Sequence, residues 1–168
     1  MSDRPIRLKA TDAEDLSVIA ACLQDAIVPL AEMRFFKDEK RFVMLVNRFR
    51  WEQGRDTDLA QRDADFSDAS AGEAHGEQRI HSGLCIDHVV AVRSRGIDRD
   101  KPGRFLMVMT MGLDGPQTLN LLFSGGGVMQ FEIETLSLFL QDFGEAWPTQ
   151  WRPDHALDLA TPVKGRGR

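Results

Sequence analysis

The sequence predicts an α+β domain: an antiparallel meander sheet, curled toward a half-barrel, with one helix at each end. Apolar residues alternate with period two from about Met33 to Thr135, as in half-buried strands. Turn-forming runs separate the alternating segments at intervals suited to hairpins. One face of the last segments is polar, which a parallel sheet would seldom allow.

The first element is a helix that we expect between about Thr11 and Val28. Thr11 and Glu14 have the spacing of a capping box, in which a hydroxyl and a carboxylate satisfy free amides at a helix start. Pro29 then prevents continuation. The apolar residues recur at helical spacing and should pack on the sheet: Leu16, Ile19, Ala20, Leu23 and Ile27.

Six or seven strands should follow, joined mostly by short turns. The Gly125-Gly126-Gly127 run is read as a hairpin turn and not as a phosphate loop, because a strand and not a helix follows it. The strand segments are Met33–Phe36, Arg41–Trp51, Ile80–Arg95, Arg104–Met111, Gln117–Phe123 and Val128–Thr135.

A closing helix is predicted after Thr135. Leu136, Phe139, Leu140 and Phe143 fall at i, i+3, i+4 and i+7, and Gly144 stands where a left-handed cap is usual. A curled sheet capped by its last helix is similar to pleckstrin-homology-like domains. Such an analogy of fold implies no function.

Residues 1–151 are predicted to form this single domain, interrupted by a mobile acidic loop at 53–78. Between Glu52 and Gln78 there are eight acidic residues and two arginines, a net charge of −6, and only two large apolar side chains. Such a segment cannot bury enough surface to offset its ordering entropy. Residues 152–168 should form a disordered basic tail.

Composition excludes several classes of protein. No apolar run approaches the roughly 20 residues of a membrane-spanning helix, and the N-terminus lacks a secretory signal. We therefore expect a soluble, cytoplasmic protein in which Cys22 and Cys85 are free thiols. Outside the acidic segment the charge is near +1, with 19 basic and 18 acidic residues, which argues against general nucleic-acid binding.

Two arginine pairs are the candidate functional residues. Arg48 and Arg50 follow one apolar run, and Arg93 and Arg95 follow another. Residues two apart on a strand point to one face, so each pair could hold a carboxylate or phosphate. The alternative is that each pair is a solvated continuation of its strand. If Arg48 faces Gly83 in a hairpin, the pairs lie roughly 33 Å apart, which disfavours one shared site.

A row of Phe105, Met107, Met109 and Met111 occupies one face of a predicted strand. We expect core packing for this row, and a dimer or ligand face is the alternative. The four histidines lack metal-like spacing, so we expect no metal and no cofactor.

No local signature of nucleophilic catalysis is evident. The sequence thus favours a non-enzymatic binding or adaptor module for a protein or an anionic small molecule, and it leaves a homodimer open. The alternative is an enzyme or binding protein that acts on an anionic small molecule held by the paired arginines.

Four segments carry a resemblance to a known family: Leu16–Asp25, Phe42–Glu52, Val90–Asp98 and Phe123–Gly127. Over about Leu8 to Pro153 the chain resembles a family of small bacterial proteins classed only as a domain of unknown function. This resemblance implies no activity and no catalytic residue. It covers all four arginines of the candidate site.

Overall fold

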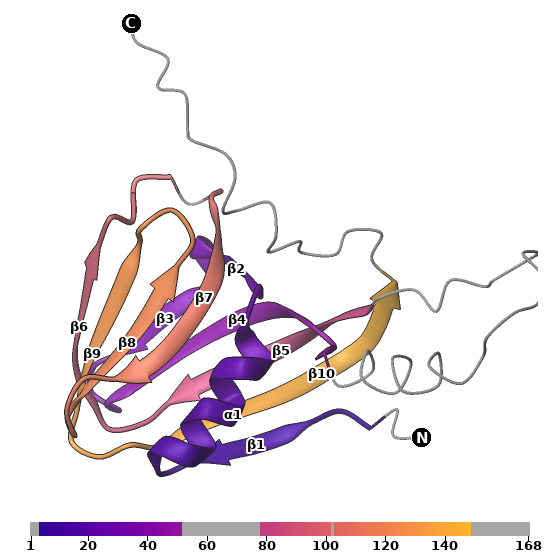
Figure 1. The fold of residues 1–168 in the computed structure, drawn as a ribbon. Helices are drawn as coiled ribbons and strands as arrows, with labels where there is room; N and C mark the ends of the chain where they lie inside the picture. Colours follow the sequence, from indigo (N-terminus) through magenta and orange to yellow (C-terminus); the bar gives the residue numbers. More distant parts are fainter. Residues whose placement is uncertain (1–3, 52–77, 102, 149–168) are drawn as a thin grey trace, which may run out of the picture.

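The computed structural model describes residues 4–51, 78–101 and 103–148. Within these ranges there are one α-helix, one turn of 3₁₀ helix and ten strands (Figure 1). In chain order the elements are β1 (Arg7–Ala10), α1 (Ala13–Leu23), β2 (Ile27–Pro29), the 3₁₀ turn η1 (Leu30–Glu32), β3 (Met33–Phe36), β4 (Arg41–Phe49), β5 (Gln78–Ile86), β6 (Val89–Arg95), β7 (Phe105–Leu113), β8 (Thr118–Phe123), β9 (Val128–Ile133) and β10 (Leu138–Pro148).

All ten strands belong to one sheet, and every paired neighbour is antiparallel. The order is β1-β10-β5-β4-β2-β7-β8-β9-β6, with β3 beside β4 off this path. The antiparallel α+β class is therefore confirmed. Consecutive strands pair as a meander in β3-β4-β5 and in β7-β8-β9. The rest of the sheet departs from a meander, because β10 returns to lie between β1 and β5, and β6 pairs with β9.

The sheet is open and curls over a single core. The rings of Phe42 on β4 and Phe131 on β9 meet edge to face at 4.8 Å, although three strands separate β4 from β9 in the sheet order. The apolar core continues from these rings to the buried face of α1, where Leu16, Ile19 and Leu23 lie. Figure 1 shows α1 crossing β4, β5 and β10 beside β7.

The N-terminal helix is confirmed but is shorter than predicted. Asp12, and not Thr11, caps it, since the Asp12 carboxylate accepts a hydrogen bond from the Asp15 amide at 2.8 Å. The chain leaves the helix at Asp25, whose φ is +62°. Asp25 and Ala26 then bond to the backbone of Val108 on β7, so Ile27 begins a strand and does not end a helix.

The predicted C-terminal helix is wrong, because residues 138–148 form β10. Leu138 and Leu140 are fully buried, whereas Phe139 and Phe143 are 42% and 45% exposed, which is the period of a strand. Gly144, with φ +75°, lies where the register of β10 against β5 shifts and is not a helix cap. The predicted similarity to pleckstrin-homology-like domains depended on that helix, and the structure does not support it.

The strands on either side of the acidic segment pair directly, as predicted, but in a different register. Arg48 faces Ile80, and Gly83 faces Leu45. The long strand predicted for residues 80–95 breaks at Asp87 and His88, where His88 has φ +59°, into β5 and β6. The predictions of a mobile loop at 53–78 and of a disordered tail at 152–168 lie outside the described residues, except for Gln78, which begins β5.

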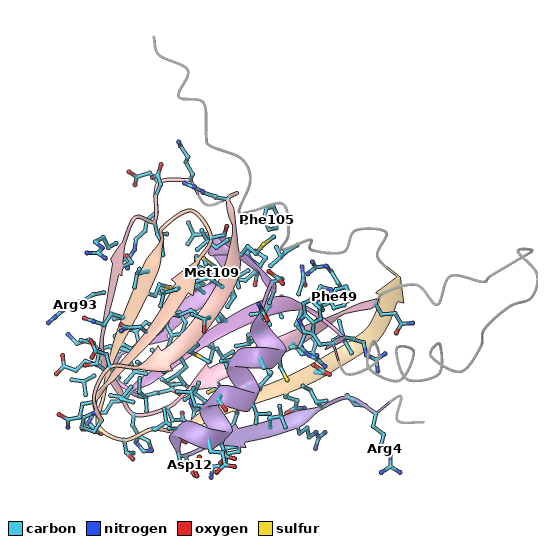
Figure 2. The ribbon with its side chains drawn as sticks, in the orientation of Figure 1. Arg4, Asp12, Phe49, Arg93, Phe105 and Met109 are labelled. Carbon is cyan, nitrogen blue, oxygen red and sulfur yellow. The ribbon has the colours of Figure 1, made fainter. Side chains whose placement is uncertain are left out.

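The side chains of Phe105, Met107, Met109 and Met111 on β7 do not all lie on one face of the strand. A register shift between Val108 and Thr110 changes the alternation, so Met111 is buried while Phe105 and Met109 are 63% and 55% exposed (Figure 2). The core packing predicted for the row therefore holds for Met111 and fails for Phe105 and Met109. Among the described residues, no helix has the length and apolar character to cross a bilayer.

Candidate functional site

Arg48 lies inside the core and binds a carboxylate of its own chain. Its Nε and Nη2 donate to the two oxygens of Asp142 on β10 at 2.8 and 2.6 Å, and both side chains are almost fully buried. Ser82 on β5 donates to the same carboxylate at 2.6 Å, and the Ile6 amide donates at 3.0 Å. The fork of the guanidinium thus holds an internal anion in bidentate geometry.

The electrostatics of Asp142 follow from this arrangement. Burial raises the pKa of the Asp142 carboxyl, but the hydrogen bonds from Arg48, Ser82 and the Ile6 amide favour the charged form. The hydrogen bonds outweigh burial, and the pKa of Asp142 lies below its ordinary value. Asp142 is therefore a carboxylate at neutral pH, and the ion pair joins β4 to β10 across β5.

Arg50 belongs to a second buried polar group, at the end of β4 and the start of β5. Its Nη1 donates to the Gln78 side chain at 2.8 Å. Arg79 donates to the Asn47 carbonyl at 3.1 Å and lies over the Phe49 ring, with 5.9 Å between its guanidinium carbon and the ring centroid. Burial lowers the pKa of Arg79. These contacts hold Arg50 and Arg79 against the sheet.

Arg93 and Arg95 are exposed on the outer face of β6, on the same side of the strand as predicted. Arg93 is opposite Gln130 on β9 and points away from the sheet in Figure 2. Neither arginine forms an ion pair with a described residue. The structure thus separates the pairs, with Arg48 in the core against β10 and Arg93 on the exterior of β6.

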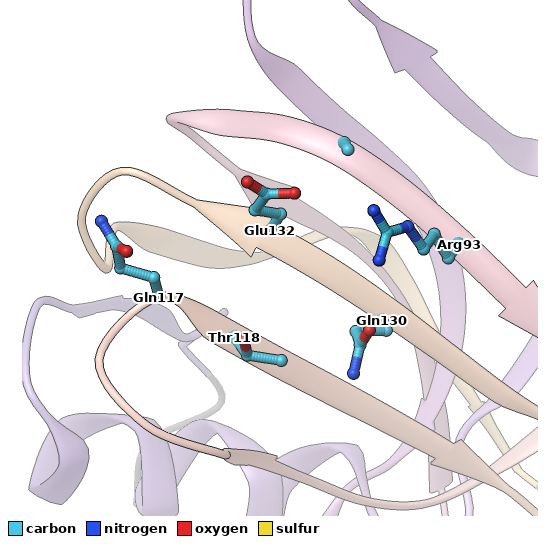
Figure 3. A pocket seen from close by; sticks show the side chains of 6 residues that line it. Arg93, Gln117, Thr118, Gln130 and Glu132 are labelled. Atoms are coloured by element: carbon cyan, nitrogen blue, oxygen red, sulfur yellow. The ribbon is translucent and has the colours of Figure 1, made fainter.

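A shallow polar groove of about 180 Å³ lies beside Arg93 (Figure 3). It crosses β6, β9 and β8 where the short side chains of Ala91 and Thr118 flank Glu132. Gln117 and Gln130 also line it. Such a groove offers hydrogen bonds but little apolar surface to a ligand.

A larger cavity, of about 340 Å³, opens at the seam of the curled sheet, between β3 and β6. We call it the seam cavity. Most of its described lining is apolar, and Ser94 and Arg99 are the only polar side chains among the described lining residues. Arg99 is exposed and makes no ion pair with a described residue. The apolar lining residues are Leu30, Met33, Phe35, Phe42, Val92, Ile97 and Met129.

Glycines shape the wall of the seam cavity next to Ile97. A Cβ on Gly96, whose φ is +71°, would lie 3.0 Å from the Gly126 carbonyl oxygen, and a Cβ on Gly127 would lie 3.1 Å from Ile97. The β8-β9 turn therefore packs directly on the end of β6. The Gly125-Gly126-Gly127 run is confirmed as a hairpin turn, closed by the bond from the Phe123 amide to the Gly127 carbonyl.

The sequence analysis did not find the seam cavity, Ser94, Arg99, Asp142 or Ser82. The signal for Asp142 was present, because it follows Leu138 and Leu140 at strand spacing and so occupies a core-facing position. An acid at such a position requires a buried partner. The seam cavity gave no local signal, since its described walls come from four separate stretches of the chain, at 30–35, 42, 92–99 and 129.

In the described residues, no three His, Cys, Asp or Glu side chains are grouped so that they could hold a metal ion. A search of curated proteins and a search of solved structures each find no match to the chain. The family model described as "Protein of unknown function (DUF2948)" matches residues 6–155. The chain therefore belongs to this family, as the resemblance in its sequence implied.

Proposed function

We propose that the protein is a binding module for a small molecule with an apolar body and one anionic group, held in the seam cavity. The observation that supports this proposal is the seam cavity itself, about 340 Å³ in volume and lined mostly by apolar side chains. Small-molecule sites commonly have about 300 to 1,000 Å³ and a few polar groups in an apolar lining, and the mouths of curled sheets are frequent places for them.

In this proposal the apolar lining binds the hydrocarbon part of the ligand, and Arg99 binds its anionic group. Each methylene that leaves water for the lining contributes about 0.8 kcal/mol. The guanidinium of Arg99 can donate two parallel hydrogen bonds to a carboxylate, and it has no acidic partner among the described residues. A ligand with a short hydrocarbon chain and a carboxylate would use both features.

The composition of the lining supports binding over catalysis. The nine lining residues that the structure describes include no His, Cys, Asp or Glu, so Ser94 has no general base within this set. Reproducible turnover of such a ligand by the pure protein would therefore count against the proposal.

Octanoate and 1-octanol provide a matched test, because they share the hydrocarbon chain and differ in charge. We expect calorimetric titration of the full chain to show octanoate binding about tenfold more tightly than octanol, a difference of about 1.4 kcal/mol. In Arg99→Gln this preference should disappear. In Ser94→Phe, which fills the seam cavity, both affinities should fall.

Arg93→Gln is the control, since Arg93 is also an exposed arginine but lies on the outer face of β6. It should leave both affinities unchanged. Failure of both compounds to bind, or binding that is insensitive to Arg99→Gln and Ser94→Phe, would refute the proposal.

A second candidate is an anion site at Arg93 and Arg95. The observation in its favour is that both guanidiniums are exposed on one face of β6 and that neither has an acidic partner among the described residues. Inorganic phosphate should then bind the wild-type chain and not Arg93→Gln/Arg95→Gln, with Arg99→Gln unaffected. Equal phosphate binding by the wild type and the double variant would eliminate this candidate.

A further inference from the structure

The central part of the outer face of β10, β5 and β4 contains no charged residue, and two outward arginines, Arg41 on β4 and Arg79 on β5, lie beyond it at opposite ends. The nine outward positions of this central part form three rows across the strands, aligned by the pairing register. No acid, lysine or arginine occurs among them, although 28% of the chain is charged. The rows are Phe139-Cys85-Val43, Gln141-Gly83-Leu45 and Phe143-His81-Asn47.

Two phenylalanine rings on this face are partly exposed to solvent. Phe139 and Phe143 are 42% and 45% exposed. The Phe143 ring lies over Gly83, where an added Cβ would be 3.7 Å from the ring edge, and it stacks on His81 with 6.1 Å between centroids. Helix α1 packs on the opposite face of these strands, and no described helix or strand covers the rings.

The uncharged face continues around the sheet. The row of Phe143 extends through Asn47 to Ile27 on β2 and Met107 on β7. Beside Met107, Phe105 and Met109 are 63% and 55% exposed. The five-strand surface, which we call the outer apolar face, has a projected area of about 450 Å² for strands ~4.8 Å apart with outward residues every ~6.7 Å.

We propose that the outer apolar face binds a second copy of this chain. In a twofold dimer each patch meets its own copy, so any charge in the patch would meet an identical charge. The outer apolar face contains none. Lys9 lies at one margin, with its ammonium 5.3 Å from the Phe139 ring centroid, and Arg34 lies at the other, opposite Val43. An apolar centre with a charged margin is the usual anatomy of an interface.

The area of the outer apolar face indicates how strongly the two copies should associate. About 450 Å² is less than the ~800 Å² per partner of a standard stable interface. The dimer should therefore be weak and should dissociate on dilution through the micromolar range. A single charge at its centre should be enough to prevent it.

Sedimentation velocity of the full chain, over a range of concentrations, tests the proposal. The wild type should shift with concentration from a species of 18.9 kDa toward one of twice that mass. Phe139→Glu and Phe143→Glu should each weaken association at least tenfold. Val18→Glu is the matched control, since Val18 is a 49% exposed apolar residue on α1, outside the outer apolar face, and this variant should associate like the wild type.

Circular dichroism confirms that each variant is folded before it is compared. A wild-type chain that stays monomeric at every concentration would refute the proposal, as would a dimer that both face variants leave intact. Co-sedimentation with vesicles of phosphatidylcholine and phosphatidylglycerol tests a lipid surface as the occupant. Vesicle binding by a monomeric wild-type chain would also overturn the proposal.

Discussion

At the scale of single residues, Arg48 and Asp142 show how a charge can belong to a core. Neither could be buried alone, because an isolated charge in an apolar interior costs several kcal/mol. Together with Ser82 and the Ile6 amide they satisfy one another through four hydrogen bonds. The pairing explains why a guanidinium predicted to hold an external anion holds an internal one.

Asp142→Asn should destabilise the fold by about 3–5 kcal/mol, because it leaves the Arg48 guanidinium buried without its counter-ion. Replacing the three side chains of the network in Arg48→Met/Asp142→Leu/Ser82→Ala should cost less than the single change, since no charge is left buried without its counter-ion, although the Ile6 amide and the Phe49 carbonyl lose a hydrogen-bond partner. Urea unfolding of the two variants measures the difference. A triple variant less stable than Asp142→Asn would contradict this account.

The pH dependence follows from the depressed pKa of Asp142. The contribution of a carboxylate with a lowered pKa is complete above its unfolded pKa, about 3.9, and is lost as the pH falls through the folded value. Wild-type stability should therefore decline below about pH 4 more steeply than that of the triple variant. Thermal unfolding from pH 6 to pH 2.5 provides the measurement, and parallel curves would show that the ion pair contributes nothing.

At the scale of elements, β10 shows that one apolar pattern can fit two periods. Leu136, Phe139, Leu140 and Phe143 match a helix, while Leu136, Leu138 and Leu140 match a strand. The strand forms because β1 and β5 lie on both sides and supply hydrogen-bond partners along its length. The choice rests on tertiary context, which outweighs local periodicity.

Alanine substitutions distinguish the strand from the helix directly. Leu138→Ala should cost about 2–5 kcal/mol, since Leu138 is fully buried. Phe139→Ala should cost less than about 1 kcal/mol, because that ring is largely outside the core. Denaturant unfolding at low protein concentration, where the proposed dimer is dissociated, provides the comparison. The reverse ranking would favour a helix at these residues.

At the scale of the whole molecule, non-local pairing holds the sheet together. β10 lies between β1, near the N-terminus, and β5, in the middle of the chain, and β6 pairs with β9 and not with its sequence neighbour β7. The fold therefore depends on its last described strand. The same return of the chain creates both proposed surfaces, because it leaves the seam between β3 and β6 open and builds the outer apolar face.

Truncation after Thr135 should abolish cooperative unfolding, because β1 loses its described partner strand and β5 loses one of its two. Truncation after His155 keeps the region that matches the family model and should leave the transition near that of the full chain. Thermal unfolding followed by circular dichroism measures both. A cooperative transition in the shorter chain would show that β10 is dispensable.

The sequence by itself determined the antiparallel α+β class, the first helix, the hairpin turn at Gly125–Gly127 and the family, since these depend on periodicity, turn residues and local motifs. Only the tertiary structure decided the strand order, the strand at 138–148, the partner of Arg48 and the seam cavity. Each of these brings together residues from distant parts of the chain. Local propensity carries no record of such contacts, because their free energy is gained only when the whole sheet assembles.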